Sequence, residues 1–276
     1  MPELPEVETT RRGLVPALAS RRVVAAHVYH DRMLRRQPNP DDFVHRLLGR
    51  VIQSLERTGK FLMFDVGDGM TWVTHLGMSG RFSVNRPEDI QGSHTRVVIS
   101  TDGGDEVRMV DPRTFGFTAV YTTTELADST MASLGPDALT ELPEPRSLAA
   151  RARGRRVAIK TLLLDQRYLA GLGNIYATEV LFEAGIGGGR PAGSVTLDEM
   201  GALRNGIQRV LEAGLKHGGT SLDDLAYLLP DGRAGRHLQY LAVYGREGRP
   251  CRRCATPIVR MALGGRSTFE CPACQT

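Results

Sequence analysis

All four cysteines of this 276-residue chain lie within its last 26 residues. They form two CxxC pairs, Cys251 with Cys254 and Cys271 with Cys274, and sixteen residues separate the pairs. This spacing is typical of a ribbon in which four thiolates bind one tetrahedral Zn²⁺, whereas two disulfides would require an oxidising compartment. Because protein ligands fill all four positions, we expect one structural zinc ion. In so short a segment, metal binding should supply much of the folding free energy.

The rest of the chain divides into a strand-rich half and a helix-rich half. After a helix expected over residues 6–19, β-branched and aromatic runs predict strands at 22–29, 51–55, 60–66, 71–75, 96–100 and 106–110. The sequences GDG at 67–69 and DGGD at 102–105 predict tight hairpins. Apolar residues three and four apart predict helices over 157–164, 174–184 and 197–216. Asn174 is suited to cap the second of these helices.

This pattern predicts an α+β multidomain protein that begins with a helix and a β-sandwich or barrel. We expect a catalytic β domain over residues 2–133 and a Pro- and acid-rich interdomain linker over 134–150. A helical domain over 151–240 and a zinc hairpin over 241–276 would follow.

Positive charge gathers in the second half of a chain whose net charge is +4. Residues 121–145 contain five acids and no Lys or Arg, whereas residues 146–160 contain six bases and no acid. A partner that carries phosphates requires such a surface, although a solvated helix face would also account for it. No apolar run approaches the roughly 20 residues that span a bilayer, and Glu3 stands where a signal peptide would be basic. We therefore expect a cytoplasmic protein with no membrane partner.

The first residues of the chain have two interpretations. If Met1 is removed, as the small neighbour Pro2 favours, the nitrogen of Pro2 becomes a secondary amine that condenses with an aldehyde to an iminium ion. The pKa of an α-amino group is about 8, so a fraction of it is nucleophilic at neutral pH. Glu3 and Glu6 lie within one helical turn of this amine. The alternative is an ordinary helix start, in which Pro5 suits the first turn and the acids suit the helix dipole.

Lysine is scarce, since Lys60, Lys160 and Lys216 are three of the 35 basic residues. Arginine supplies nearly all the positive charge. The presence of a lysine in such a chain therefore indicates a role that arginine cannot perform, such as releasing a proton. Lys60 and Lys160 are therefore candidates for chemistry.

Three separated segments closely resemble the bacterial formamidopyrimidine-DNA glycosylase family. They are PELPEVE at residues 2–8, GLGNIY at 171–176 and the zinc hairpin ending GRSTF at 265–269. Shorter landmarks fall in the same order, namely TGKF at 58–61, HLGMSG at 75–80, DPRTFG at 111–116 and VYGR at 243–246. The similarity covers essentially the whole chain, and the joint order is far more specific than any one segment.

The resemblance implies a base-excision repair enzyme that removes 8-oxoguanine and formamidopyrimidines from duplex DNA and then cuts the abasic strand by β- and δ-elimination. It also implies a β-sandwich domain, a helix-two-turn-helix domain and a zinc finger. We expect a bacterial protein that acts on DNA at the nucleoid, and a monomer is sufficient to process one lesion. By match to the family motifs, Pro2 forms a Schiff base at the sugar C1′ and Glu3 donates a proton. Glu6 is the second carboxylate beside that amine. Lys60 would serve β-elimination and Arg266, just past the turn at residues 264–265, δ-elimination.

A base inside a duplex must be flipped out before it can be excised. Met78 is adaptable enough to fill the gap, Phe115 offers an apolar face and Arg113 offers paired donors to a base edge. The resemblance assigns these three to filling the void and reading the orphaned cytosine, although an isolated Met or Phe would be expected in a core. Other DNA contacts expected by position are His75, His94, Arg156, Lys160, Asn174 and Tyr244. The loop at 216–235 would cap the flipped base.

Some positions depart from the family pattern, and two other functions remain open. Arg156 stands where lysine is common, Thr114 where a basic residue is frequent, and GGG at 187–189 replaces a more usual His-Pro turn. An endonuclease VIII-like enzyme for oxidised pyrimidines would commonly have glycine at the position of Leu4. A non-catalytic lesion-binding zinc protein would be expected to lack Pro2, Glu3 or Lys60.

Overall fold

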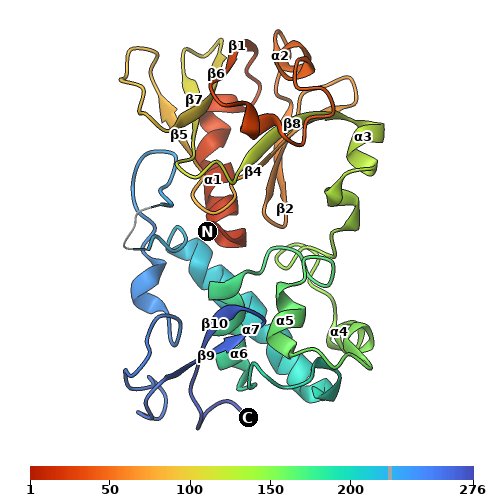
Figure 1. Cartoon of the computed structure of the whole chain (residues 1–276), viewed down its shortest axis with the longest axis vertical. Helices are drawn as coiled ribbons and strands as arrows, with labels where there is room; N and C mark the ends of the chain where they lie inside the picture. Colours follow the sequence, from red (N-terminus) through yellow and green to blue (C-terminus); the bar gives the residue numbers. More distant parts are fainter. Residues whose placement is uncertain (223–225) are drawn as a thin grey trace. The chain divides into compact units, whose positions relative to one another are not determined.

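The computed structural model describes residues 1–222 and 226–276, which separate into two compact units (Figure 1). The first unit comprises Met1–Ser133 and Leu215–Leu238, and the second comprises Leu134–Gly214 and Gln239–Thr276. The segment Leu215–Leu238 thus packs with the first unit, although the sequence grouped it with the preceding helices. Part of the expected base-capping loop, residues 223–225, lies outside the described residues.

The first unit contains two four-stranded antiparallel sheets, as the sequence predicted for a β-sandwich. One sheet has the order β1 (Val23–Val28), β6 (Thr95–Thr101), β7 (Glu106–Val110) and β5 (Arg81–Asn85). The other has the order β2 (Ser54–Thr58), β3 (Phe61–Asp65), β4 (Met70–His75) and β8 (Phe117–Thr122). The predicted hairpins join β3 to β4 and β6 to β7. Strands β5 and β8 were not predicted.

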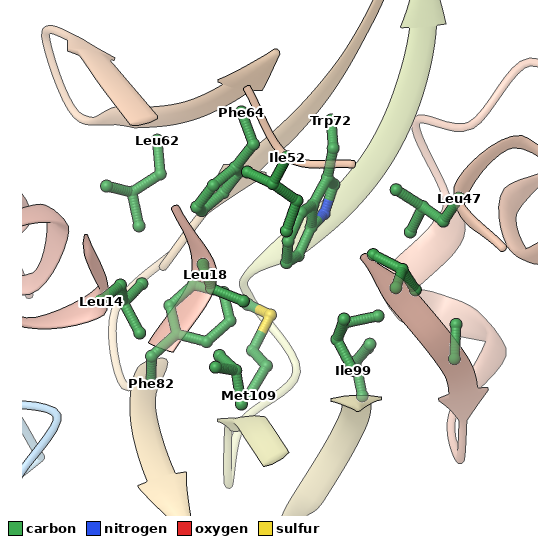
Figure 2. Packing of buried hydrophobic residues seen from close by; sticks show 14 of the residues in the cluster. Leu14, Leu18, Leu47, Ile52, Leu62, Phe64, Trp72, Phe82, Ile99 and Met109 are labelled. Atoms are coloured by element: carbon green, nitrogen blue, oxygen red, sulfur yellow. The ribbon is translucent and has the colours of Figure 1, made fainter. Parts of the chain in front are cut away.

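Both sheets and the first helix, α1 (Leu4–Leu18), contribute to one apolar core (Figure 2). Trp72 of β4 stacks on Phe64 of β3 with ring centroids 4.1 Å apart. Phe82 of β5 meets the edge of the same indole at 6.4 Å, so these aromatic rings join the two sheets. Leu14 and Leu18 are fully buried in the same cluster, which fixes α1 and the residues that precede it against the strands.

The first unit also contains short helices, two between β1 and β2 and two after β8. They are η1 (Asp31–Leu34), α2 (Asp42–Leu47), α3 (Thr123–Ala127) and η2 (Thr130–Ser133). The strand predicted at 51–55 begins later, because the amide of Ile52 donates to the carbonyl of Arg21 instead of to a neighbouring strand. The amide of Gln53 then donates to the carbonyl of Asp65 in β3 at 2.7 Å, and the strand begins at Ser54.

The second unit is mainly helical and carries the cysteine hairpin. Its elements are α4 (Pro145–Ala152), α5 (Ile159–Leu164), α6 (Asn174–Ala184), η3 (Ala192–Ser194), α7 (Leu197–Lys216, whose last two residues belong to the first unit), η4 (His237–Tyr240, which begins in the first unit), β9 (Val259–Leu263) and β10 (Arg266–Glu270). The bounds of α6 and α7 match the prediction, whereas α4 starts inside the segment expected to be a linker. Leu148 and Ala152, four residues apart, are buried and hold α4 in the unit.

The hairpin of β9 and β10 packs on α6 through Phe182, which shares a core cluster with Phe269 and Cys271. Among the described residues, no helix has the length and apolar character needed to span a bilayer.

Candidate active site

The beginning of α1 is buried and held by a carboxylate. Pro2 and Glu3 are both buried, and the amide of Glu3 donates to Oε2 of Glu6 at 2.8 Å. Oε1 of Glu6 accepts a second amide, that of Thr220, at 2.7 Å. The Tyr227 hydroxyl donates to the carbonyl oxygen of Glu6 at 3.3 Å. The side chain of Glu6 thus links the start of the chain to the segment Leu215–Leu238.

The turn that carries Lys60 is tied to the same helix by one arginine. Nε of Arg57 donates to Glu8 of α1 at 3.3 Å, and its Nη1 donates to the carbonyl of Gly59 at 2.9 Å. Burial raises the pKa of Glu8, but hydrogen bonds from arginines of α1 lower it more, so the carboxylate remains charged. Lys60 follows Gly59 directly and is 7% exposed. Arg57 therefore connects the segments that hold two of the expected catalytic groups.

His75, at the end of β4, is a neutral imidazole beside this turn. Burial, together with the nearby charges of Lys60 and Arg35, lowers the pKa of His75 to about 4. Its Nδ1 accepts the amide of Gly77 at 3.0 Å, which leaves the proton on Nε2. The ring lies 4.9 Å from that of Phe61. His75 can therefore act as a hydrogen-bond donor with a fixed tautomer.

Met78 and Phe115 project from two loops whose backbones touch. Both side chains are 40% exposed, which is high for large apolar groups in a protein with an ample core. A Cβ on Gly77 would lie 2.4 Å from the carbonyl carbon of Phe115 and from the amide of Gly116, so only glycine permits this approach. The guanidinium of Arg113 lies 4.6 Å from the centroid of the Phe115 ring.

The buried carboxylate of Asp111 holds the two loops together. Asp111 is 0% exposed and accepts hydrogen bonds from Ser79 Oγ at 2.7 Å, the Gly116 amide at 2.7 Å and the Arg113 amide at 3.2 Å. Charge-assisted bonds of this kind are stronger than neutral ones. The exposed groups Met78, Arg113 and Phe115 therefore stand on a rigid base.

Two arginines and a histidine complete the surroundings of these loops. Arg35 donates to the carbonyls of Gly116 and, at 2.7 Å, of Phe115, and Arg32 donates to the carbonyl of Thr114 at 3.3 Å. His94 is exposed, and its backbone carbonyl accepts the amide of Asp111 at 2.9 Å. Sequence reasoning missed Asp111, Arg32 and Arg35 as supports.

In the second unit, Lys160 faces the hairpin and not the solvent. It is 0% exposed, and its Nζ donates to the carbonyl of Ser267 at 3.0 Å and to Oγ1 of Thr268 at 2.8 Å. The ammonium group of Lys160 donates two hydrogen bonds to β10, and its expected direct contact with DNA remains a prediction. Lysine here supplies a buried point charge that secures the strand carrying Arg266.

Asn174 also binds the hairpin, and the predicted cap is wrong. The N-cap of α6 is Gly173, and Asn174 is the first helical residue. Its Nδ2 donates to the carbonyl of Ser267 at 3.0 Å, the same oxygen that Lys160 binds. Arg266, next to Ser267, is exposed just past the turn Gly264–Gly265. The buried Lys160 and the partly buried Asn174 thus position Ser267, the residue beside the exposed arginine.

Other predicted contacts in this unit differ in exposure. Arg156 is exposed on the connection between α4 and α5. Tyr244 is partly buried, and its ring meets the edge of Phe269 at 5.1 Å. Its amide, with those of Ala242 and Val243, donates to the carboxylate of Glu179. Tyr244 therefore belongs to the packing around the hairpin.

The four cysteines form a group that fits one zinc ion. Their Sγ atoms all lie within 4.8 Å of one another, with separations of 3.3 Å for Cys254–Cys274 and 4.0 Å for Cys251–Cys274. Tetrahedral zinc with bonds of about 2.3 Å requires sulfur atoms about 3.8 Å apart. All four ligand positions come from the chain, which makes the site structural.

Sequence models of three domains match the chain. They are the formamidopyrimidine-DNA glycosylase N-terminal domain at residues 1–118, the formamidopyrimidine-DNA glycosylase H2TH domain at 134–225, and the zinc finger found in FPG and IleRS at 248–276. The chain belongs to the formamidopyrimidine-DNA glycosylase family. The resemblance inferred from the sequence, the α+β fold and the structural zinc are thereby confirmed.

Curated members of the family are similar over the full length. The formamidopyrimidine-DNA glycosylase of Moorella thermoacetica is 44% identical over 95% of this chain and 94% of its own. That of Geobacillus kaustophilus is 40% identical over the whole of both chains. Among solved structures, the Lactococcus lactis Fpg in complex with abasic-site DNA aligns with a TM-score of 0.91 at 28% identity over the whole of both chains. MutM (Fpg) from Thermus thermophilus aligns with a TM-score of 0.89 at 37% identity over 99% of this chain and 98% of that one.

Proposed function

We propose that this DNA glycosylase of the formamidopyrimidine-DNA glycosylase family uses Pro2, Glu3 and Lys60 to excise oxidised purines and cut the abasic strand. The observation that carries the assignment is the buried start of α1, where Glu6 holds Glu3 beside Pro2. Arg57 joins this helix to the turn of Lys60. A nucleophile, a carboxyl group and an amine are what imine chemistry on a sugar requires.

In the proposed reaction, loss of Met1 leaves the Pro2 nitrogen as the nucleophile. It bonds to C1′ of the damaged nucleotide as the bond from C1′ to the base breaks and the base leaves with the electron pair. The attached nitrogen loses its proton and Glu3 protonates the ring oxygen, so the bond from C1′ to that oxygen breaks and the sugar opens to an iminium ion. That cation makes the C2′ proton acidic, and removal of this proton expels the 3′ phosphate. The conjugated iminium ion that results makes the C4′ proton acidic in turn, and removal of that proton expels the 5′ phosphate. Lys60 serves the first elimination and Arg266 the second.

In this scheme Glu6 is a positioning residue that holds the backbone of Glu3. Both of its carboxylate oxygens accept backbone amides, from Glu3 and from Thr220. An acceptor held in this way fixes the direction of the Glu3 side chain by fixing its backbone. It also makes the geometry at Pro2 depend on the segment Leu215–Leu238.

We assign recognition of the flipped-out site to the loops that Asp111 braces. Met78 would fill the gap in the base stack, with Phe115 beside it, and the donors of Arg113 would read the opposite cytosine. Exposed apolar groups on a rigid base support this role, because a wedge must resist the stack it enters. His75, through Nε2, and His94 would donate to nearby phosphates.

In the second unit, Arg266 and Arg156 are exposed and suited to grip phosphates. The start of α6 at Asn174 would offer backbone amides to a phosphate. The buried position of Lys160 and its two hydrogen bonds to β10 support a role for it in holding the hairpin, in place of the direct DNA contact expected from the resemblance. We propose that Tyr244 likewise supports the hairpin through packing.

The substrates are proposed from the relatives and from the site. Solved relatives are described in complex with DNA that contains an abasic site, Fapy-dG or carbocyclic 8-oxo-G. We propose 8-oxoguanine and formamidopyrimidines paired with cytosine as substrates, a monomer as the active form and the bacterial cytoplasm, at the nucleoid, as the location. The domain boundaries at residues 133, 150 and 240 were placed from the sequence motifs, and they remain part of the proposal. One Lactococcus lactis Fpg structure contains an oxidised pyrimidine, so pyrimidine lesions are a second candidate.

Single-turnover excision on an 8-oxoguanine duplex tests the proposal, with Glu3→Gln compared with Glu56→Gln. Glu56 is an exposed carboxylate of β2 and is the matched control. Loss of a general acid should slow excision by about 10²–10⁴-fold in Glu3→Gln and leave Glu56→Gln unchanged. A preformed abasic site has no base to expel and opens to an aldehyde without the enzyme, so Glu3→Gln should still cleave it. Equal excision by both variants would refute the role of Glu3, and preference for 5-hydroxyuracil over 8-oxoguanine would support the second candidate.

A further inference from the structure

A concave site lies in the second unit where α4 approaches the connection from α5 to α6. Its volume is about 410 Å³, and it is lined by Arg151, Arg155, Asp165, Arg167 and Tyr168. None of these residues belongs to the groups assigned above to chemistry, lesion recognition or zinc. The volume falls within the range of sites for small ligands.

Among the described residues, two of the three guanidinium groups bind backbone carbonyls, although the charge of Arg155 also acts on the carboxylate of Asp165. Nη2 of Arg151 donates to the carbonyl of Arg167 at 2.9 Å, and Nε of Arg155 donates to the carbonyl of Arg151 at 3.1 Å. Carbonyl oxygens orient these groups without neutralising them. Arg167 alone pairs with a carboxylate, that of Asp165 at 3.0 Å. Three cations and one anion give the site a net charge of +2 from its lining.

The wall of the site is also fixed. The guanidinium of Arg151 lies 5.5 Å from the centroid of the Tyr168 ring, and the Tyr168 hydroxyl donates to the carbonyl of Leu148 in α4 at 3.1 Å. The remaining N–H groups of Arg151 and Arg155 are therefore held in a cationic hollow. Paired N–H donors in this setting match the oxygens of a phosphate.

We propose that this hollow is a phosphate-binding subsite for the DNA backbone, outside the nucleotide that reacts. Arg155 directly precedes Arg156, a proposed phosphate contact, and Arg167 lies on the connection that leads to the start of α6 at Asn174. The subsite thus continues a basic surface along two segments that already bear proposed contacts. The inference rests on the proposed function in that the chain must bind DNA.

Salt dependence of binding tests the subsite, with Arg155→Gln compared with Arg153→Gln. Arg153 is exposed two residues away, lies outside the lining and loses the same charge. Each phosphate neutralised on duplex DNA contributes about 0.9 to the slope of log K against log salt. Arg155→Gln should lower this slope by about one unit on damaged and undamaged duplexes alike. Arg153→Gln should change it by less than half as much and should leave excision at saturating enzyme unchanged.

The outcomes distinguish a DNA phosphate from a free anion as the ligand, and they distinguish failure of the subsite from failure of the proposed function. A wild-type slope in Arg155→Gln, or equal losses in both variants, would overturn the subsite while wild-type excision keeps the proposed function intact. Calorimetry with inorganic pyrophosphate provides the second arm. Binding that requires Arg155 while the DNA slope does not would assign the hollow to a free anion and overturn the DNA assignment. A wild-type chain that fails to bind DNA would overturn the proposed function itself.

Discussion

Replacement of Asp111 by Asn should loosen both loops that carry the proposed wedge. The carboxylate accepts three hydrogen bonds, two of them at 2.7 Å, and is 0% exposed. The amide group of Asn turns one acceptor into a donor, which would then face either the Gly116 amide or the hydroxyl of Ser79. Losing one charge-assisted bond at about 2 kcal/mol and weakening two others by about 1 kcal/mol each gives about 4 kcal/mol.

Urea unfolding measures this loss, with Asp41→Asn as the matched control. Asp41 is an exposed carboxylate of the same unit, so its replacement should change the free energy of unfolding by less than about 0.5 kcal/mol. Asp111→Asn should also weaken binding to a duplex with 8-oxoguanine, since Met78, Arg113 and Phe115 lose their base. Ser79→Ala, which removes one bond only, should cost about 1–2 kcal/mol. Equal stability of Asp111→Asn and Asp41→Asn would refute the bracing role of Asp111.

Three further predictions concern pH, the hairpin and the metal. The pKa values of His75 and His237 are lowered to about 4 by burial, from about 6.5. Their contribution to stability is therefore complete above pH 6.5 and is lost as the pH falls toward 4, and titration of unfolding should show a smaller loss in His75→Gln. Lys160→Met should destabilise the protein by about 1–3 kcal/mol without changing the salt slope of DNA binding, whereas Arg266→Ala should lower that slope by about one unit. An unchanged slope in Arg266→Ala would remove it from the binding surface. Chelation of zinc should unfold the hairpin and abolish DNA binding, as circular dichroism and binding assays would report, and full binding without zinc would contradict its structural role.

Local signals were sufficient for much of the fold. The hairpins at 67–69 and 102–105, the ends of α6 and α7 and the cysteine group follow from turn residues, apolar periodicity and spacing, and each is present. The strands predicted at 22–29 and 96–100 are also present, as Val23–Val28 and Thr95–Thr101. These features depend on neighbours in the sequence.

Long-range contacts explain what the sequence did not reveal. Lys160 looked like a chemical lysine, but its ammonium binds β10, more than a hundred residues away along the chain. The pairing of Glu6 with Thr220 brings Leu215–Leu238 to the first unit, and no local pattern marks it. Arg35 braces Phe115 from a segment that resembles any other basic surface. Partners of this kind are set by tertiary packing, which residue spacing does not encode.

Borohydride trapping followed by mass spectrometry of the crosslinked peptide tests the central claim most directly. The substrate is a duplex with one 8-oxoguanine opposite cytosine, and the proteins are the mature chain and a form that retains Met1. The account predicts one covalent adduct that maps to Pro2 and is lost when Met1 is retained. An adduct at Lys60, or strand cleavage without any trapped adduct, would contradict the assignment of Pro2 as the nucleophile.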